Sequence, residues 1–208
     1  VFGKILVLTI VILTGSAALA GEPMKAKIVI LATGGTIAGA AATGVQAGYT
    51  SGEVGVETLI DAVPQLSELA DISGEQVANV GSQDMSDEVW LLLADRVNTL
   101  LASKDVDGIV ITHGTDTIEE TSYFLNLIVN SDKPVVMTAA MRPATALSAD
   151  GPLNIFNAVA VAADAEAKGR GVLIVINDDI HGARGMTKTS TTDVQTFVSA
   201  ERGLMGAT

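Results

Sequence analysis

The chain has 208 residues, a formal net charge of −12 at pH 7 and a hydrophobic content of 48%. This length predicts one domain with a substantial core, and the acidic charge argues against nucleic acid or an anionic membrane surface as a partner. The absence of cysteine and the presence of only two histidines exclude disulfides, thiol nucleophiles, and metal sites built on cysteine or on several histidines.

Residues 1–20 have the pattern of a secretory signal peptide. Lys4 precedes an apolar run over residues 5–13, and a segment of small residues follows it. The apolar run is shorter than the roughly 20 residues that a membrane span needs. We therefore predict cleavage after Ala20, a periplasmic or secreted location with no membrane attachment after cleavage, and a single α/β domain over residues 21–208.

From residue 27 onward, short β-branched runs alternate with stretches of helical periodicity. The predicted strands cover residues 27–32, 76–80, 108–112, 134–139 and 171–176. The predicted helices cover residues 86–103, 117–129 and 150–167. This alternation is typical of a parallel sheet, so we predict a three-layer, doubly wound, mostly parallel α/β fold with helices on both faces. Right-handed crossovers would then place the carboxyl ends of the strands at one edge.

Each predicted helix has a local signal at its start. Ser86 has the position of an N-cap, and Gly151-Pro152 is a typical helix opening. The stretch from Thr117 to Glu120 fits a capping box, in which the threonine side chain accepts a hydrogen bond from a backbone N–H of the first turn.

The most informative motif is Thr33-Gly34-Gly35-Thr36, which directly follows the first predicted strand. Its two glycines permit a tight turn and leave the backbone N–H groups open to a ligand. The motif does not fit the G-x-G-x-x-G pattern of dinucleotide-binding folds, and it lacks the lysine of a phosphate-binding loop. A nucleotide-binding switch is therefore disfavoured, and the motif alone is also compatible with a plain turn.

Three further polar clusters lie near or beyond the ends of predicted strands, at residues 81–84, 113–117 and 187–189. Together with the first motif they supply hydroxyls, an amide, a carboxylate and an ammonium group, an inventory that suits a hydroxyl nucleophile acting on a small polar substrate. The glycine-rich segment over residues 39–55 is a candidate lid over this edge, and a plain connection is the alternative.

These motifs, in this order, closely resemble those of the bacterial type II, exported L-asparaginases. The resemblance runs from about residue 27 to 196, and its most specific parts are T-G-G-T-I-A-G at 33–39 and H-G-T-D-T at 113–117. It implies the N-terminal α/β domain of the asparaginase fold and a reaction without a cofactor. Family members continue into a smaller C-terminal domain and form homotetramers in which a neighbouring subunit completes the substrate site. The resemblance thus implies that this chain carries the first domain of a homotetrameric protein.

The resemblance also assigns roles to individual catalytic residues. It makes Thr36 the nucleophile and Tyr49, on the lid, its hydrogen-bonding partner. It makes Thr115, Asp116 and Lys188 a second catalytic group. His113, although it lies in the same motif, is expected to be a structural hydrogen-bonding residue and not a base.

The implied reaction is attack of the Thr36 oxygen on the side-chain amide of L-asparagine, loss of ammonia, and hydrolysis of the acyl-enzyme to L-aspartate. A threonine hydroxyl is a poor nucleophile at neutral pH, so a neighbouring group must take its proton. Tyr49 and Lys188 are the two candidates, and the sequence does not choose between them. Backbone N–H groups around Thr36 and Thr115 are the expected donors to the oxyanion.

By the same resemblance, the substrate's α-carboxylate and α-amino ends are held by Ser82, Gln83 and Asp116. The dual-specificity glutaminase-asparaginases share both threonine motifs. Residues 81–85 look more like the asparagine-preferring branch, with L-glutamine as a secondary substrate, because one methylene gives only modest discrimination. A binding module without catalysis is the alternative from another class. It would keep Ser82 and Asp116 and would not need Thr36, Thr115 and Lys188 together.

Overall fold

The computed structural model describes residues 24–44 and 48–208, so the predicted signal peptide at residues 1–20 lies outside the described residues. The strands are β1 Ala26–Gly34, β2 Ala70–Val80, β3 Gly108–Thr112, β4 Val135–Thr138, β5 Val172–Ile176, β6 Asp179–Gly182, β7 Thr187–Lys188, β8 Phe197–Val198 and β9 Gly206–Ala207. The helices are α1 Val56–Asp61, α2 Leu66–Leu69, α3 Asp87–Ala102, α4 Ile118–Ile128 and α5 Gly151–Ala163, with short 3-10 turns at Thr36–Ala38, Ser82–Asp84 and Ala165–Ala167. Among these described residues, no helix has the length and apolar character to cross a membrane.

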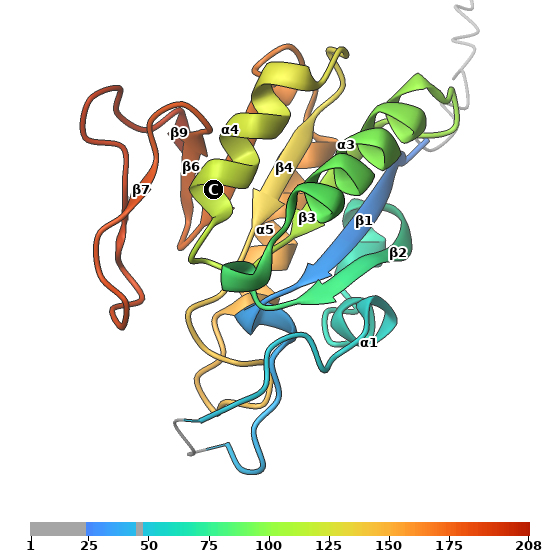
Figure 1. Cartoon of the computed structure of the whole chain (residues 1–208). Helices are drawn as coiled ribbons and strands as arrows, with labels where there is room; N and C mark the ends of the chain where they lie inside the picture. Colours follow the sequence, from blue (N-terminus) through green and yellow to red (C-terminus); the bar gives the residue numbers. More distant parts are fainter. Residues whose placement is uncertain (1–23, 45–47) are drawn as a thin grey trace, which may run out of the picture.

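The fold is built on a seven-stranded sheet with the order β2-β1-β3-β4-β5-β6-β9 (Figure 1). The pairings from β2 to β5 are parallel, and those of β6 with β5 and β9 are antiparallel. The chain leaves β1 to one side to form β2 and then returns to the other side to form β3. Ligands of open α/β sheets bind beyond the carboxyl ends of the strands at such a switch point, which here lies between β1 and β3.

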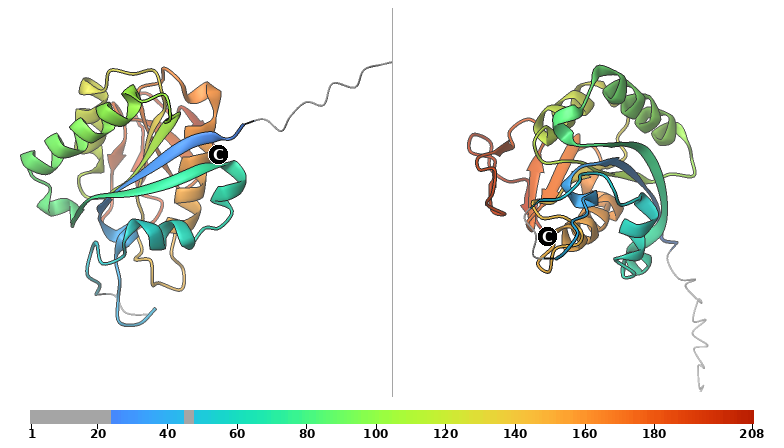
Figure 2. Two further views of the ribbon diagram at one scale, coloured as in Figure 1. Left: turned by 90° about the vertical axis from the view of Figure 1, so that its right-hand side faces the viewer. Right: turned by 60° about the horizontal axis from the view of Figure 1, so that its bottom comes forward.

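Helices cover both faces of this sheet (Figure 2). One face packs against α1, α2 and α5, and its core includes Ile28, Ile30, Val110, Leu66 and Ile155. The other face packs against α3 and α4, and its core includes Leu31, Ile109, Ile111, Leu93 and Leu125. The predicted three-layer, mostly parallel α/β fold is therefore confirmed.

The edges of the sheet differ from the sequence-based prediction. β2 begins at Ala70, six residues before the predicted start at residue 76. It is an edge strand, and after the buried Ala70 its residues are exposed or only partly buried, so they lack the continuous apolar run of a central strand. The β5–β6 hairpin was not predicted. Its two-residue turn is Asn177-Asp178, with φ angles of 51° and 67°, the left-handed backbone that such short hairpin turns require.

All three predicted helix starts are correct, but the predicted capping box at Thr117 is wrong. Ser86 accepts a hydrogen bond from the Val89 N–H at 3.4 Å, as an N-cap does. Thr117 precedes α4 but makes no capping bond, because its hydroxyl donates instead to the carbonyl oxygen of Ser82 at 2.9 Å. The third helix, α5, ends at Ala163 and not at residue 167, because the chain turns there into a short 3-10 segment.

Candidate active site

Three loops meet at the carboxyl ends of β1, β2 and β3 because glycines remove the side chains between them. A Cβ on Gly35, which has a φ of +79°, would lie well inside van der Waals contact with the backbone of Gly114. A Cβ on Gly114 would lie 2.5 Å from the Ser82 Oγ. The loops that carry the predicted nucleophile, the second catalytic group and the substrate-binding residues are therefore in direct contact.

Thr36 lies at the start of the 3-10 turn after β1, and only 8% of its surface is exposed. Its Oγ1 is 2.5 Å from the Oη of Tyr49. Tyr49 belongs to the predicted lid, which returns over Thr36 through a two-way backbone bridge between Ala40 and Thr50. Gly39 makes room for the ring, since a Cβ there would be 2.7 Å from the Cδ2 of Tyr49. Residues 45–47 of the lid lie outside the described part of the chain.

Lys188 comes from β7, far along the chain, and reaches the loop after β3. Its Nζ donates to Thr115 Oγ1 at 2.8 Å and to Asp116 Oδ1 at 2.6 Å. The lysine side chain is 12% exposed, whereas that of Asp116 is 57% exposed. Lys188 is thus a mostly buried ammonium group held between a hydroxyl and a carboxylate, and not a solvated surface lysine.

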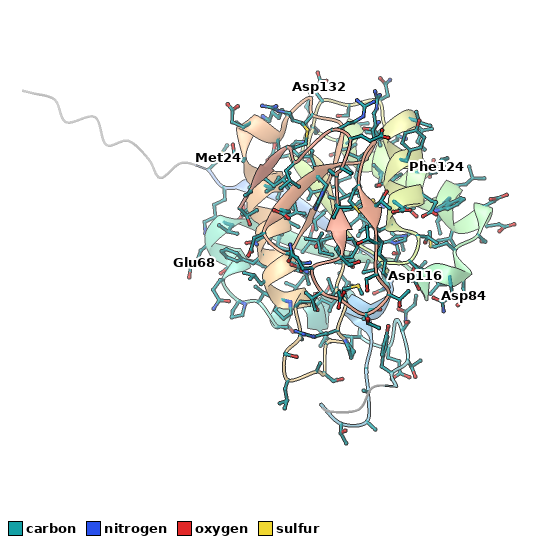
Figure 3. All side chains as sticks on the ribbon, turned by 90° about the vertical axis from the view of Figure 1, so that its left-hand side faces the viewer. Met24, Glu68, Asp84, Asp116, Phe124 and Asp132 are labelled. Atoms are coloured by element: carbon teal, nitrogen blue, oxygen red, sulfur yellow. The ribbon has the colours of Figure 1, made fainter. Side chains whose placement is uncertain are left out.

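The predicted substrate-binding residues lie at the rim of the same loops. The Ser82 Oγ accepts a hydrogen bond from the backbone N–H of Asp116 at 3.1 Å, which leaves its hydroxyl proton available to a ligand. Gln83 is exposed, and its side-chain amide donates to Asp84 at 3.2 Å. Figure 3 shows Asp116 and Asp84 near each other on one side of the molecule, whereas Asp132, in the loop before β4, lies at its top.

His113 is fully buried behind this loop, and its two ring nitrogens both have partners. Nδ1 donates to the carbonyl oxygen of Gly114 at 2.8 Å, so Nε2 accepts the hydrogen bond from Thr121 Oγ1 at 3.0 Å. Thr121 in turn accepts a bond from Trp90 Nε1 at 2.8 Å. Burial lowers the pKa of His113 to about 4, because the charged form cannot be hydrated. The imidazole is therefore neutral at physiological pH, and its contacts are those of a structural residue.

Glu119 is a residue of this region that the sequence reasoning did not assign to the site. Its Oε2 accepts a hydrogen bond from the backbone N–H of Lys188 at 2.9 Å. The sequence offered only the weak signal of a glutamate in the first turn of a helix.

Within residues 24–44 and 48–208, no group of three or more histidine, cysteine, aspartate or glutamate residues has a geometry that would hold a metal ion.

Comparisons with known proteins match this fold and these motifs. A family model described as "Asparaginase, N-terminal" matches residues 27–208. L-asparaginase 2 of Escherichia coli is 58% identical over 180 residues, which are 86% of this chain and 51% of that protein. A glutaminase-asparaginase of Pseudomonas fluorescens is 53% identical over 175 residues, 84% of this chain and 48% of that protein.

A solved structure agrees with the architecture as well as the sequence. The crystal structure of a probable cytoplasmic L-asparaginase from Campylobacter jejuni superposes with a TM-score of 0.86 at 53% identity, covering 88% of this chain and 56% of that one. The chain spans about half the length of the curated relatives it matches.

Proposed function

Because the chain belongs to the asparaginase family, we propose that the whole protein of which it forms the N-terminal part hydrolyses L-asparagine to L-aspartate and ammonia through a threonine acyl-enzyme. The observation that carries this proposal is the pair of hydroxyl contacts at one edge of the sheet. Thr36 faces Tyr49, and Thr115 faces a mostly buried Lys188. A site that only bound an amino acid would have no use for two such pairs.

In the first half of the proposed reaction, the Thr36 oxygen attacks the side-chain amide carbon of asparagine. The Tyr49 hydroxyl is the group in direct contact with the Thr36 oxygen, at 2.5 Å, which favours it over Lys188 as the acceptor of the threonine proton. Charge that develops on the amide oxygen would be stabilised by backbone N–H groups of the loops after β1 and β3. Transfer of this proton through Tyr49 to the amide nitrogen then breaks the C–N bond, releases ammonia and leaves an ester on Thr36.

In the second half, water hydrolyses this ester. Lys188 lies 2.8 Å from Thr115 Oγ1, so this pair would orient the attacking water and exchange protons with it. The free hydroxyl proton of Ser82 suits the substrate α-carboxylate, and the exposed carboxylate of Asp116 suits the α-ammonium group. Gln83 would complete this end of the pocket from the rim.

Dual specificity for asparagine and glutamine is the second candidate. It is favoured by the 53% identity to a protein named glutaminase-asparaginase, which is close to the 58% identity to a protein named L-asparaginase 2. The two substrates differ by one methylene, which a pocket distinguishes by about 1–3 kcal/mol. We therefore expect some glutaminase activity beside the main reaction.

The organisation of the whole protein is part of the same proposal. We propose that residues 1–20 direct export to the periplasm or the medium and that residues 21–208 are the N-terminal domain. The relatives are about twice as long as the matched region, so a further domain would follow in the whole protein. As in the family, we propose assembly into a homotetramer.

The test is ammonia release from L-asparagine and L-glutamine by the whole protein and by its Thr36→Val and Tyr49→Phe variants. Valine matches the shape of threonine without the hydroxyl, so we expect Thr36→Val to lower kcat by about 10⁴-fold or more. Loss of a proton acceptor in Tyr49→Phe should lower kcat by about 10²- to 10⁴-fold.

Calorimetric binding of L-asparagine to Thr36→Val is the matched control. Binding without turnover in this variant, beside rapid turnover in the parent, supports the nucleophile. Binding without ammonia release in the parent protein itself would favour the amino-acid-binding module and overturn the proposed reaction.

A further inference from the structure

Glu119 connects α4 to the strand that carries Lys188. Its Oε2 accepts the backbone N–H of Lys188 at 2.9 Å, although the two residues lie 69 positions apart in the sequence. The neighbouring Glu120 belongs to the same helical turn and is exposed. We propose that Glu119 is a positioning residue, which holds the backbone of Lys188 so that its ammonium group meets Thr115 and Asp116. This inference rests on the proposed function.

Lys188 needs such an anchor because its strand is not part of the main sheet. In the part of the chain that the structure describes, β7 pairs with β8 in a separate two-stranded sheet. Figure 1 shows this segment as an arm beside the seven-stranded sheet. The next residue, Thr189, donates its N–H to Thr196 at 2.9 Å. In an antiparallel pair the bonding direction alternates, so the N–H of Lys188 points away from β8. Glu119 is the partner that satisfies it.

The loop after β3 and the first turn of α4, which are continuous in sequence, therefore hold both ends of Lys188. Thr115 and Asp116 contact its Nζ, and Glu119, three residues beyond Asp116, contacts its backbone N–H. A carboxylate makes this bond shorter and stronger than a neutral acceptor would. Displacement of a catalytic group by about 1 Å costs about 10²-fold in rate. A shift of the Lys188 backbone would therefore lower kcat.

The test separates the reach of the Glu119 side chain from its charge. Glu119→Gln keeps the length and an amide oxygen that accepts the same bond, whereas Glu119→Asp keeps the charge and withdraws the carboxylate by one methylene. In the whole protein we expect Glu119→Asp and Glu119→Ala to lower kcat for L-asparagine by about 10- to 100-fold with KM changed by less than about 3-fold. We expect Glu119→Gln to stay within about 5-fold of the parent kcat, because the amide oxygen replaces the carboxylate oxygen.

Glu120→Asp is the matched control, since it makes the same change one position along the helix, and its kcat should equal that of the parent. An active Glu119→Asp with an impaired Glu119→Gln would show that the charge matters and not the reach, and would overturn the inference. Unchanged kcat in both Glu119→Asp and Glu119→Ala would also overturn it.

A double-variant cycle with Lys188→Met tests whether Glu119 acts through Lys188. Adding Glu119→Ala to Lys188→Met should lower kcat no further, because the group that Glu119 positions is already gone. A further 10-fold loss would assign Glu119 another role. Unchanged ammonia release in Lys188→Met would overturn the proposed mechanism at Lys188, and the inference with it. A loss in Lys188→Met beside full activity in Glu119→Ala would overturn the inference alone.

Discussion

The reactivity proposed for Thr36 would depend on two separate properties of its position. The residue follows a buried strand, so its backbone is fixed by the sheet, and its side chain is almost enclosed. Its hydroxyl meets one group of the lid, the Tyr49 hydroxyl. The strand therefore fixes the proposed nucleophile, and the predicted lid supplies the contact that would activate it. This arrangement couples the proposed chemistry to the position of Tyr49.

Gly35 is the residue on which the contact between the loops after β1 and β3 depends. In Gly35→Ala, the methyl group would enter the backbone of Gly114, and alanine would be forced to a φ of +79°. With a ψ of −174°, this backbone lies in an extended region that is essentially restricted to glycine, so it costs alanine about 1–3 kcal/mol, and overpacking adds about 1–3 kcal/mol. We expect a loss of unfolding free energy of roughly 2–6 kcal/mol, measured by urea denaturation, together with a lower kcat.

Gly169→Ala is the control for this prediction. Gly169 has a similar φ of +70°, but a Cβ there would meet nothing within 4 Å. Its loss of stability should therefore be about 1–2 kcal/mol, from the backbone conformation alone. Equal losses in the two variants would contradict the steric role of Gly35.

At the scale of elements, burial decides which strands the sequence predicts. β3 and β5 are buried along their whole length, and their continuous apolar runs were located to within one residue. The longer β2 was located only in its last five residues, because an edge strand alternates polar and apolar side chains as a surface loop also does. The antiparallel strands β6 and β9 were missed, since β9 has two residues and its pairing partner is set by tertiary contacts.

For the candidate site as well, the sequence predicts what depends on the sheet and misses what depends on long-range contacts. The predicted positions of Thr36, Ser82 and Thr115 require only that parallel strands share one carboxyl edge, and the structure brings their loops together. Local rules could not predict Glu119, because its partner lies 69 residues away on a strand outside the main sheet. The capping-box spacing also gave a wrong prediction at Thr117, because its hydroxyl donates to the carbonyl oxygen of Ser82 in a neighbouring loop and does not cap its own helix.

The contrast between Ser86 and Thr117 can be measured at single amides. Ser86→Ala removes the acceptor of the Val89 N–H, a long bond of 3.4 Å, so we expect a loss of about 0.5–1 kcal/mol of unfolding free energy. Hydrogen exchange at the Val89 amide should become faster. In Thr117→Val the first-turn amides of α4 should exchange at their parent rates, because they never bonded the Thr117 hydroxyl. Faster exchange at these amides would show that the Thr117 hydroxyl does cap α4.

At the scale of the whole molecule, one network of hydrogen bonds joins α3 and α4, the helices of one layer, to the sheet. His113 follows β3, Thr121 lies on α4, and Trp90 lies on α3. Their hydrogen bonds run from Trp90 Nε1 through Thr121 Oγ1 to His113 Nε2. Both histidine nitrogens already have partners, so a proton on Nε2 would force the proton of the Thr121 hydroxyl to turn away from the ring.

This network makes the stability of the whole fold sensitive to pH. The pKa of His113 falls from 6.5 to about 4 on folding, because of burial. The unfolded chain therefore takes up a proton at a higher pH than the folded one. The stabilising contribution of neutral His113 is fully present above pH 6.5, and it decreases as pH falls from 6.5 towards 4. A shift of this size corresponds to roughly 3 kcal/mol at the acid end of the window.

The measurement compares the parent with His113→Gln, which has no titrating ring and can still accept a bond from Thr121. Between pH 7.5 and pH 4.5 the unfolding free energy of the parent should fall by roughly 2–3 kcal/mol more than that of the variant. Trp90 is the single tryptophan of the chain, so its fluorescence reports unfolding from within the network. Burial also lowers the pKa of His181, but this residue is present in both proteins and its effect cancels. Parallel pH profiles would show that His113 is not the group whose protonation destabilises the fold.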